Sequence, residues 1–450
     1  MMKSIILIKL IKEFVKNENY KKLKELLGTM HVPDIADILE KLDIVDRKMI
    51  YENMDVEDVA ILITEINSEY QEEMITLLEN HRLKEVLENM SNDDIADIFG
   101  EVSEEEVKHL MKLMDDEDRE EVKKLVKHES DSAGGLMTTE YFTVFTGVKI
   151  KEVIAQLKRK GEDAELIYYI YIIDKSNKLK GVVSLRDIII NNGDIVIDKI
   201  MKKNLISVNV ETDQEDVASI FSKYDLFAVP VVDEGNKLIG IITVDDIIDV
   251  MEEEATEDLY AMAGLTENES EKNNIISSVK IRFPWLMVSL FGELISATIM
   301  QEFGYALNKI VALAFFIPLI MAMGGNSGSQ SSAMMVRKIA LGEDEKSKLL
   351  KHIWKETVAG VIVGIISGVL VGIISYLWQG NILLSFIISF SLFVAMTWAA
   401  WFGSIIPLTF EKFKIDPAVA SGPFITTAND VGGILIYFGL ATVLMKVLKV

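Results

Sequence analysis

The sequence contains no cysteine, which removes several classes of site from consideration. Disulfides, thiolate zinc sites and iron–sulfur clusters all require cysteine, so none of them can form. The five histidines are scattered without HExxH spacing, and we expect them to be surface or structural residues rather than metal ligands. Because no nucleophile–base pair or metal-ligand spacing is present either, the sequence does not indicate an enzyme.

Positive charge is also scarce, since 46 Lys and Arg face 70 Asp and Glu and the formal net charge is −24. Residues 1–280 hold 61 acidic and 34 basic residues, whereas residues 281–450 hold 9 and 12. A surface this acidic repels nucleic acid and attracts cations. Nucleic acid is therefore not an expected partner. The first part has room for two or more soluble domains, and the second has the size of a five-helix membrane domain.

Residues 1–130 have helical periodicity and a loose internal repeat. The apolar run at the N-terminus is broken by Lys9 and Lys12, so it reads as an amphipathic helix rather than a signal peptide. Asp34, Asp58 and Asp94 each stand at an expected helix start, followed by apolar residues on one face. This pattern predicts stacked helix pairs in a small solenoid. Most of these acids can equally be helix caps or solvated surface.

Between residues 137 and 255 a strand–turn–strand–helix phrase occurs twice, 59 residues apart. Its first copy has strands at 167–174 and 179–184, and its second at 228–233 and 238–243. The duplicated unit resembles a tandem pair of CBS modules, which implies a regulatory cassette that often binds adenine nucleotides. Arg186 and Asp187, at a strand–helix junction, are the candidate nucleotide-binding residues for ATP. An empty cassette that serves as a dimerisation plate is an equally open interpretation.

An acidic segment, 245–258, follows the cassette. On a helix, Asp246, Asp249, Glu253 and Glu257 line one face, where like charges destabilise an isolated helix. This segment is either a solvated acidic helix or a face whose charge is neutralised by divalent cations against acids of another domain.

The second part of the chain contains five apolar segments long enough to span a membrane. We predict spans at 283–300, 310–336, 358–378, 382–410 and 419–445. The basic loop between the second and third spans, together with Lys280 and Arg282, predicts that the soluble part is cytoplasmic. Gly360, Gly364, Gly368 and Gly372 predict a smooth ridge for close helix packing.

Two of these spans carry polar motifs at membrane depth. The second includes MGGNSGSQSS (323–332), and DPAVASGPFITTANDVGG (416–433) leads into the fifth. Ionised groups are costly in a bilayer core and usually face a water-filled path or a partner. A helix would place Asp416 and Asp430 about 21 Å apart, so we expect two acids stacked along one helix as a route for a hard cation. Glu293 lies within the first span and is expected to pair with a polar group of a neighbouring helix, contributing to stability.

With these motifs, the chain resembles the MgtE family of magnesium channels over nearly its whole length. The resemblance implies an all-α superhelical N-domain, α/β tandem CBS domains and an α-helical transmembrane domain of five helices. The corresponding boundaries are 1–130 for the N-domain, 131–200 and 201–250 for the two CBS modules, 251–280 for an acidic connecting helix and 281–450 for the pore domain. It also implies a homodimer in the plasma membrane, with a pore between the protomers and cytoplasmic N-terminal domains.

Family knowledge assigns candidate residues by motif position. Asp430 matches the acid that binds hydrated Mg²⁺ in the pore, and Asp416 matches an acid near its cytoplasmic mouth. Thr426, Thr427, Asn429 and Asn326 are the remaining pore candidates. The candidate cytoplasmic sensor acids are Asp93, Asp97, Asp213, Glu215, Asp225, Asp246, Asp249, Glu254 and Glu257. Some relatives have Asn where this chain has Gly422, so a side-chain ligand is absent there.

The chemistry of these residues agrees with Mg²⁺ as cargo. Mg²⁺ usually keeps several waters and binds through one or two carboxylates, which Asp430 and its polar neighbours could supply by outer-shell hydrogen bonds. Soft ligands are lacking, which disfavours copper or zinc as the main cargo. A broader transporter of Co²⁺ and Mn²⁺ remains an alternative. An anion transporter regulated by CBS modules would require basic residues at the site, and a membrane sensor that transports nothing would not need the polar motifs.

The acidic half also predicts feedback by intracellular Mg²⁺. Two carboxylates about 5 Å apart repel by roughly 3 kcal/mol at an effective dielectric constant of 20. If the 245–258 face packs against Asp93 and Asp97, the domains should separate without cations and come together when Mg²⁺ binds. The connecting helix would then hold the pore closed.

Overall fold

The computed structural model describes residues 2–161, 164, 166–265, 275–340, 346–420 and 422–447. By its internal contacts the chain divides into two compact units, Met1–Val250 and Met251–Val450. The boundary between them falls inside one helix, α14 (Val244–Ala263), which ends at Gly264, a residue with a φ of +72°. Of the connecting helix that we expect at 251–280, α14 covers the part up to Ala263. Residues 266–274 lie outside the described residues.

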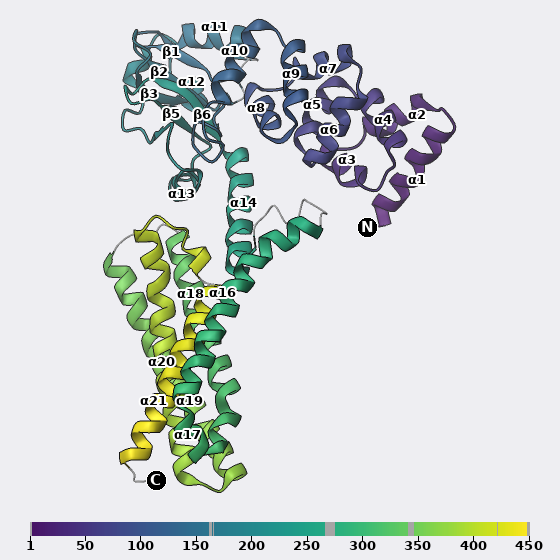
Figure 1. The fold of residues 1–450 in the computed structure, drawn as a ribbon. Coiled ribbons are helices and arrows are strands. Elements are labelled where there is room, and N and C mark those ends of the chain that lie inside the picture. The colour runs from purple at the N-terminus through teal and green to yellow at the C-terminus, as the bar shows by residue number, and fades with distance from the viewer. Residues whose placement is uncertain are drawn as a thin grey trace. The chain divides into compact units, whose positions relative to one another are not determined.

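The N-terminal part of the first unit is built from short helices stacked in chain order (Figure 1). Side-chain caps at Ser91 and Ser103 accept hydrogen bonds from backbone N–H groups three residues later, which begins two of the helices. Apolar faces of all these helices share one core. The helices are α1 (Met2–Lys16), α2 (Tyr20–Leu27), α3 (Val32–Leu39), α4 (Ile44–Asn53), α5 (Val56–Thr64), α6 (Ser68–Leu77), α7 (Asn80–Leu87), α8 (Asn92–Glu101), α9 (Glu104–Leu113) and α10 (Asp116–Leu125).

The rest of the first unit contains two small sheets of the same topology. Each has a parallel pair followed by an antiparallel hairpin, in the orders β1-β2-β3 and β4-β5-β6. Asn177 and Asn236 occupy equivalent left-handed positions in the two hairpin turns. The elements are β1 (Thr143–Phe145), α11 (Ile150–Lys160), β2 (Tyr169–Ile173), β3 (Leu179–Ser184), α12 (Leu185–Ile190), η2 (Ile197–Lys199), β4 (Val208–Asn209), α13 (Gln214–Tyr224), β5 (Ala228–Val232) and β6 (Leu238–Thr243).

The two hairpins also bond to each other, which makes the duplicated units one cassette. The N–H of Leu179 donates to the carbonyl of Asn236 at 3.0 Å, and the N–H of Leu238 donates to the carbonyl of Asn177 at 3.1 Å. These reciprocal hydrogen bonds join the two modules at their hairpin turns. The predicted duplication of a strand–turn–strand–helix unit is confirmed.

The second unit is a bundle of long apolar helices that run beside one another (Figure 1). Among the described residues, five segments are long and apolar enough to cross a membrane, as the sequence predicts. The hydroxyl of Tyr437 donates to the carbonyl of Leu313 at 2.9 Å inside the core. The elements are α16 (Ile275–Glu302), α17 (Gly304–Lys309), η3 (Val311–Phe316), α18 (Ile317–Ala340), α19 (Lys346–Gln379), α20 (Ile382–Lys412), η4 (Ala418–Ala420) and α21 (Pro423–Val447).

Close helix packing in this bundle depends on the predicted glycine ridge of α19. A Cβ at Gly368 would lie 2.7 Å from the carbonyl oxygen of Ser389 on α20, closer than real side chains approach. Gly360, Gly364 and Gly372 meet the same helix along its length. The ridge therefore lets the backbones of α19 and α20 come together, as expected.

One expectation about the fifth span is wrong. Asp416 and Asp430 do not lie on a single helix, because α21 begins only at Pro423 and Asp416 precedes the short η4 turn. Proline is favoured in the first turn of a helix and disfavours helical geometry in the residue before it. Pro417 and Pro423 therefore interrupt helical geometry at two points between Asp416 and Asp430. The motif is a turn followed by a helix start.

Candidate functional site

The polar motif of α18 stays helical and is enclosed by α20 and α21. A Cβ at Gly328 would overlap the side-chain amide of Asn429, and a Cβ at Gly403 would overlap the carbonyl oxygen of Gly328. These two glycines therefore allow three helix backbones to converge. Asn429 is only 1 % exposed as a result, whereas Asn326 on the same helix as Gly328 is exposed.

Asp430 lies at the centre of this arrangement and is 9 % exposed. A Cβ at Gly325 would lie 3.9 Å from its Oδ1 atom, so the carboxylate faces the glycine backbone of α18. From α16, the carboxyl group of Glu293 lies near the Asp430 carboxyl group, next to the point where a Cβ at Gly292 would overlap the methyl group of Thr427. A buried acid in a spanning helix thus has glycine backbone on one side and a second acid on the other.

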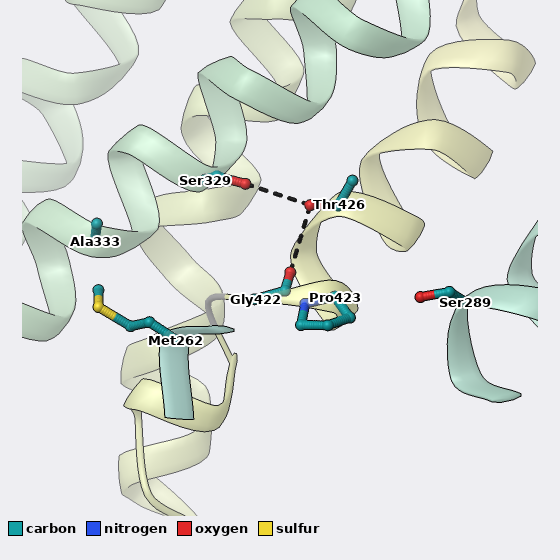
Figure 2. A pocket seen from close by; sticks show the side chains of 7 residues that line it. All are labelled: Met262, Ser289, Ser329, Ala333, Gly422, Pro423 and Thr426. Carbon is teal, nitrogen blue, oxygen red and sulfur yellow. Dashed lines mark hydrogen bonds between the residues drawn. The ribbon is translucent and has the colours of Figure 1, made fainter. Parts of the chain in front are cut away.

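One helical turn before Asp430, a pocket of about 450 Å³ opens between α16, α18 and α21. Its polar lining consists of Ser289, Ser329 and Thr426, as Figure 2 shows. The Thr426 hydroxyl donates to the carbonyl of Gly422 at 3.4 Å, and the Ser329 hydroxyl lies 3.5 Å from Thr426 Oγ1. Thr427, the next residue, is half-buried and packs against Gly292 of α16.

Acids also gather where α21 begins. Asp416 is exposed, and its Oδ1 atom accepts the N–H of Ala418 at 2.7 Å. Burial raises the pKa of Asp258, near the end of α14, to about 6, and the negative charges of Asp416, Glu254 and Glu257 add to this effect. The structure therefore brings Asp258, which lies on the same helix as the predicted sensor acids Glu254 and Glu257, close to the predicted mouth acid Asp416.

The end of α14 also touches the start of α21 directly. A Cβ at Gly422 would overlap the carbonyl oxygen of Met262, and a Cβ at Gly264 would lie 3.0 Å from the ring of Pro423. Glycine at position 422 thus gives space for α14, which explains why a larger side chain is absent there. The neighbouring motif residue Ser421 lies outside the described residues.

A second acidic cluster lies in the first unit, between α8 and the first turn of α14. Burial raises the pKa of Asp97 to about 8, although part of its side chain reaches solvent, and Asp93, Asp94 and Asp246 add to this rise. Asp93 is 7 % exposed, and burial raises its pKa as well. Asp93 and Asp97 on α8 thus lie close enough to Asp246 for their charges to act on one another.

Asp246 also has a structural role that its counterpart in the first module shares. Its Oδ2 atom accepts the Thr243 hydroxyl at 2.6 Å, and Asp187 Oδ2 accepts the Ser184 hydroxyl at 2.7 Å. The two pairs occupy equivalent positions of the repeat, each at a strand–helix junction. Burial raises the pKa of Asp246 to about 7 against the effect of the Thr243 hydrogen bond. Arg186, beside Asp187, is exposed.

The remaining sensor candidates are more dispersed. Asp249 is exposed on α14, one turn after Asp246. Asp213 caps the N-terminus of α13 by accepting the N–H of Glu215 at 2.9 Å, whereas Asp225 ends that helix with a φ of +52°. Within one chain, Asp225 does not lie beside Asp213 and Glu215, because these residues are at opposite ends of α13.

Sequence reasoning did not assign three of the residues at these sites. Asp258 was part of the acidic segment but was not distinguished from its neighbours. Glu140 accepts the N–H of Asn92 at 3.3 Å beside the Asp93 cluster, yet it lies in an irregular segment with no motif. Ser289 lies four residues before Glu293, and only this helical spacing signals its place on the α16 face.

The chemistry available at these sites is that of oxygen ligands. Within the described ranges, no three His, Cys, Asp or Glu side chains are grouped closely enough to hold a metal ion directly. Carboxylates, hydroxyls and backbone carbonyls with space between them suit a hard cation that keeps its water shell.

Comparison with known proteins places the chain in a family. Residues 317–440 match MgtE, described as a divalent cation transporter, residues 30–131 match the MgtE intracellular N domain, and residues 133–191 and 196–253 match the CBS domain. The chain belongs to the MgtE family. It is accordingly a multi-pass plasma-membrane protein of a magnesium transporter family, with N-terminal soluble domains.

MgtE relatives agree over most of the chain. Those named magnesium transporter MgtE include proteins of Bacillus subtilis, 40 % identical over 70 % of both chains, and of Enterococcus faecalis, 39 % identical over 71 % of this chain and 70 % of the relative. A crystal structure of the cytosolic domain of the Mg²⁺ channel MgtE in complex with ATP covers 53 % of this chain and 98 % of that one, with 37 % identity and a TM-score of 0.52. The soluble part of a magnesium transporter aligns with 32 % identity, a TM-score of 0.52 and coverage of 56 % and 99 %.

Proposed function

We propose that this chain forms a magnesium-selective channel that imports Mg²⁺ across the plasma membrane and is closed by intracellular Mg²⁺. The observation that supports this most directly is the burial of Asp430 in a spanning helix against the glycine backbone of α18. Ionised residues at membrane depth usually mark an ion pathway, since their cost must be offset by water, a partner or a permeating ion.

The proposed ion-binding step uses few direct ligands. Mg²⁺ releases water reluctantly, so the Asp430 carboxylate would accept hydrogen bonds from water molecules on the ion. Thr426, Thr427, Asn429 and Asn326 would add oxygen atoms around this hydrated cation. In a homodimer with its pore between protomers, two copies of Asp430 would offset the two charges of the ion.

Closure would involve the two acidic clusters. Intracellular Mg²⁺ would neutralise Asp93, Asp97 and Asp246, and a second group of ions would neutralise Glu254, Glu257 and Asp416. Asp249 would join them along α14, while Asp213, Glu215 and Asp225 would act through α13. Each ion needs to favour the closed state only modestly, because several sites acting on one equilibrium make the response steep.

The CBS cassette would bind an adenine nucleotide. Arg186, in the first turn of α12 directly after β3, carries an exposed guanidinium, a group that pairs well with phosphate. Asp187 lies in the first turn of α12, and its carboxylate accepts a hydrogen bond from the Ser184 hydroxyl. The related cytosolic domain that was crystallised with ATP supports this assignment.

Uptake of Mg²⁺ into liposomes that contain the purified protein tests the proposed function. Wild-type protein should carry Mg²⁺, and Asp430→Ala should abolish the flux at an equal amount of folded protein, because the ion loses its countercharge in the site. Parallel assays with Mn²⁺, Co²⁺ and Ca²⁺ give the selectivity. Equal fluxes of Co²⁺ or Mn²⁺ would identify a broader divalent cation transporter, and undiminished flux in Asp430→Ala would remove that residue from the mechanism.

A further inference from the structure

Glu293 is an acid that the proposed pathway does not use. It lies on α16 within the membrane span Ser278–Glu302, and its side chain is exposed. An ionised carboxylate facing lipid in a bilayer core costs a few kcal/mol or more, so such groups face water or a partner instead. The groups around Glu293 therefore indicate the function of its carboxyl group.

Glu293 lies near the pore acid itself. Its carboxyl group is close to that of Asp430 across the interface where α16 packs against α21. The helices are held close at this level, because a Cβ at Gly292 would overlap the methyl group of Thr427. A tight helix crossing thus fixes the two carboxyl groups together.

The same face of α16 carries further polar and small residues. Ser289, Gly292, Glu293 and Ser296 follow one another at intervals of three, one and three residues, which places them on one side of a helix. Ser289 and Thr426 both line the pocket (Figure 2), and they precede Glu293 and Asp430, respectively, by four residues, about one helical turn. Ser296 is fully buried, and its hydroxyl has no hydrogen-bond partner among the described residues. This face continues the polar surface of the pocket past the acid pair.

We propose that Glu293 is a specificity-determining residue of the ion site at Asp430, where α16 supplies the second carboxylate of each protomer. Two carboxylates in contact repel each other, and a divalent cation between them removes this repulsion while a monovalent one removes only part of it. In the proposed homodimer, each protomer then contributes two carboxylates, Asp430 and Glu293, to the site. This inference rests on the proposed function and gives α16 a place in the pathway.

The test compares Glu293→Gln with Glu302→Gln, which removes the same charge from the end of the same helix. In liposomes, Glu293→Gln should raise the half-saturating Mg²⁺ concentration by about tenfold, a factor that corresponds to 1.4 kcal/mol of lost binding free energy. It should also increase inhibition of Mg²⁺ uptake by K⁺. Glu302→Gln should match wild type, and the melting temperatures of all three proteins should agree.

Wild-type half-saturation and K⁺ sensitivity in folded Glu293→Gln would overturn the inference and leave Glu293 a structural partner of Asp430. If Glu293→Gln does not fold, Glu293→Asp decides, because it keeps the charge but withdraws it from Asp430. That variant should show a smaller rise in half-saturation, and no rise would overturn the inference. Absence of Mg²⁺ flux in wild type would instead refute the proposed function. Loss of flux in Asp430→Ala together with wild-type half-saturation and K⁺ sensitivity in Glu293→Gln would refute only the role of Glu293.

Discussion

At the scale of single residues, the pore region depends on glycines that make room for polar side chains. Gly328→Ala should destabilise the membrane domain by about 1–3 kcal/mol, because the added methyl group would collide with the amide of Asn429. Gly324→Ala is a matched control, since nothing lies within 4 Å of a Cβ at that position. Thermal unfolding in detergent measures both, and equal melting temperatures would contradict the close packing of α18 on α21.

Asp416 should matter less for transport than Asp430, because it is exposed and better screened by water and salt. We expect Asp416→Ala to reduce Mg²⁺ uptake by about fivefold, the factor that roughly 1 kcal/mol represents. Asp416→Asn removes the charge while keeping an oxygen that can accept the Ala418 N–H. If the asparagine variant transports like wild type, Asp416 acts through the turn and its charge has no part in the pathway.

The sequence predicted some site residues and not others for a physical reason. Asp430 was recognisable because an acid, an amide and paired glycines interrupt an apolar span. The partnership of Glu293 with Asp430 was not recognisable, because it depends on which two helices are neighbours and on their rotation. Asp258 was hidden in the same way within a run of similar acids.

At the scale of elements, local rules predicted the spans well and their ends less well. Apolar length identified the five membrane helices, and the four-residue glycine spacing identified the face of α19 that meets α20. The start of α21 was placed too early because hydropathy does not register the two prolines that interrupt the chain. The motif at 323–332 contains many weak helix formers, yet packing against α20 and α21 keeps α18 helical.

The acidic helix α14 provides a prediction at this scale. Proteolytic cleavage within residues 255–275 should slow as Mg²⁺ rises from micromolar to millimolar concentrations, because bound ions relieve the repulsion between carboxylates. Asp249→Asn combined with Glu254→Gln should weaken this protection. As a control, Glu69→Gln with Glu105→Gln removes two exposed acids of the N-domain helices and should leave the protection intact. A cleavage rate in wild type that does not change with Mg²⁺ would mean that the acidic face is only solvated surface.

At the scale of the whole molecule, charge is divided in the same way as the two roles that we propose, cation sensing in residues 1–280 and transport in residues 281–450. The acidic excess lies entirely in residues 1–280, where cations would be sensed, whereas the membrane part holds 9 acidic and 12 basic residues. The order of parts was predictable because each has its own sequence periodicity. How acids distant in the sequence come together was not predictable, since the approach of Asp258 to Asp416 forms only in the folded unit.

The most direct test of this account is the Mg²⁺ current through membrane patches containing the wild-type protein, measured while Mg²⁺ on the cytoplasmic side is varied. Inward current should be largest at micromolar cytoplasmic Mg²⁺ and should fall steeply as the concentration reaches the millimolar range. Asp430→Ala should carry no current at any concentration. A Mg²⁺ current that is independent of cytoplasmic Mg²⁺ would contradict closure by the acidic domains, and the absence of any Mg²⁺ current would contradict the channel itself.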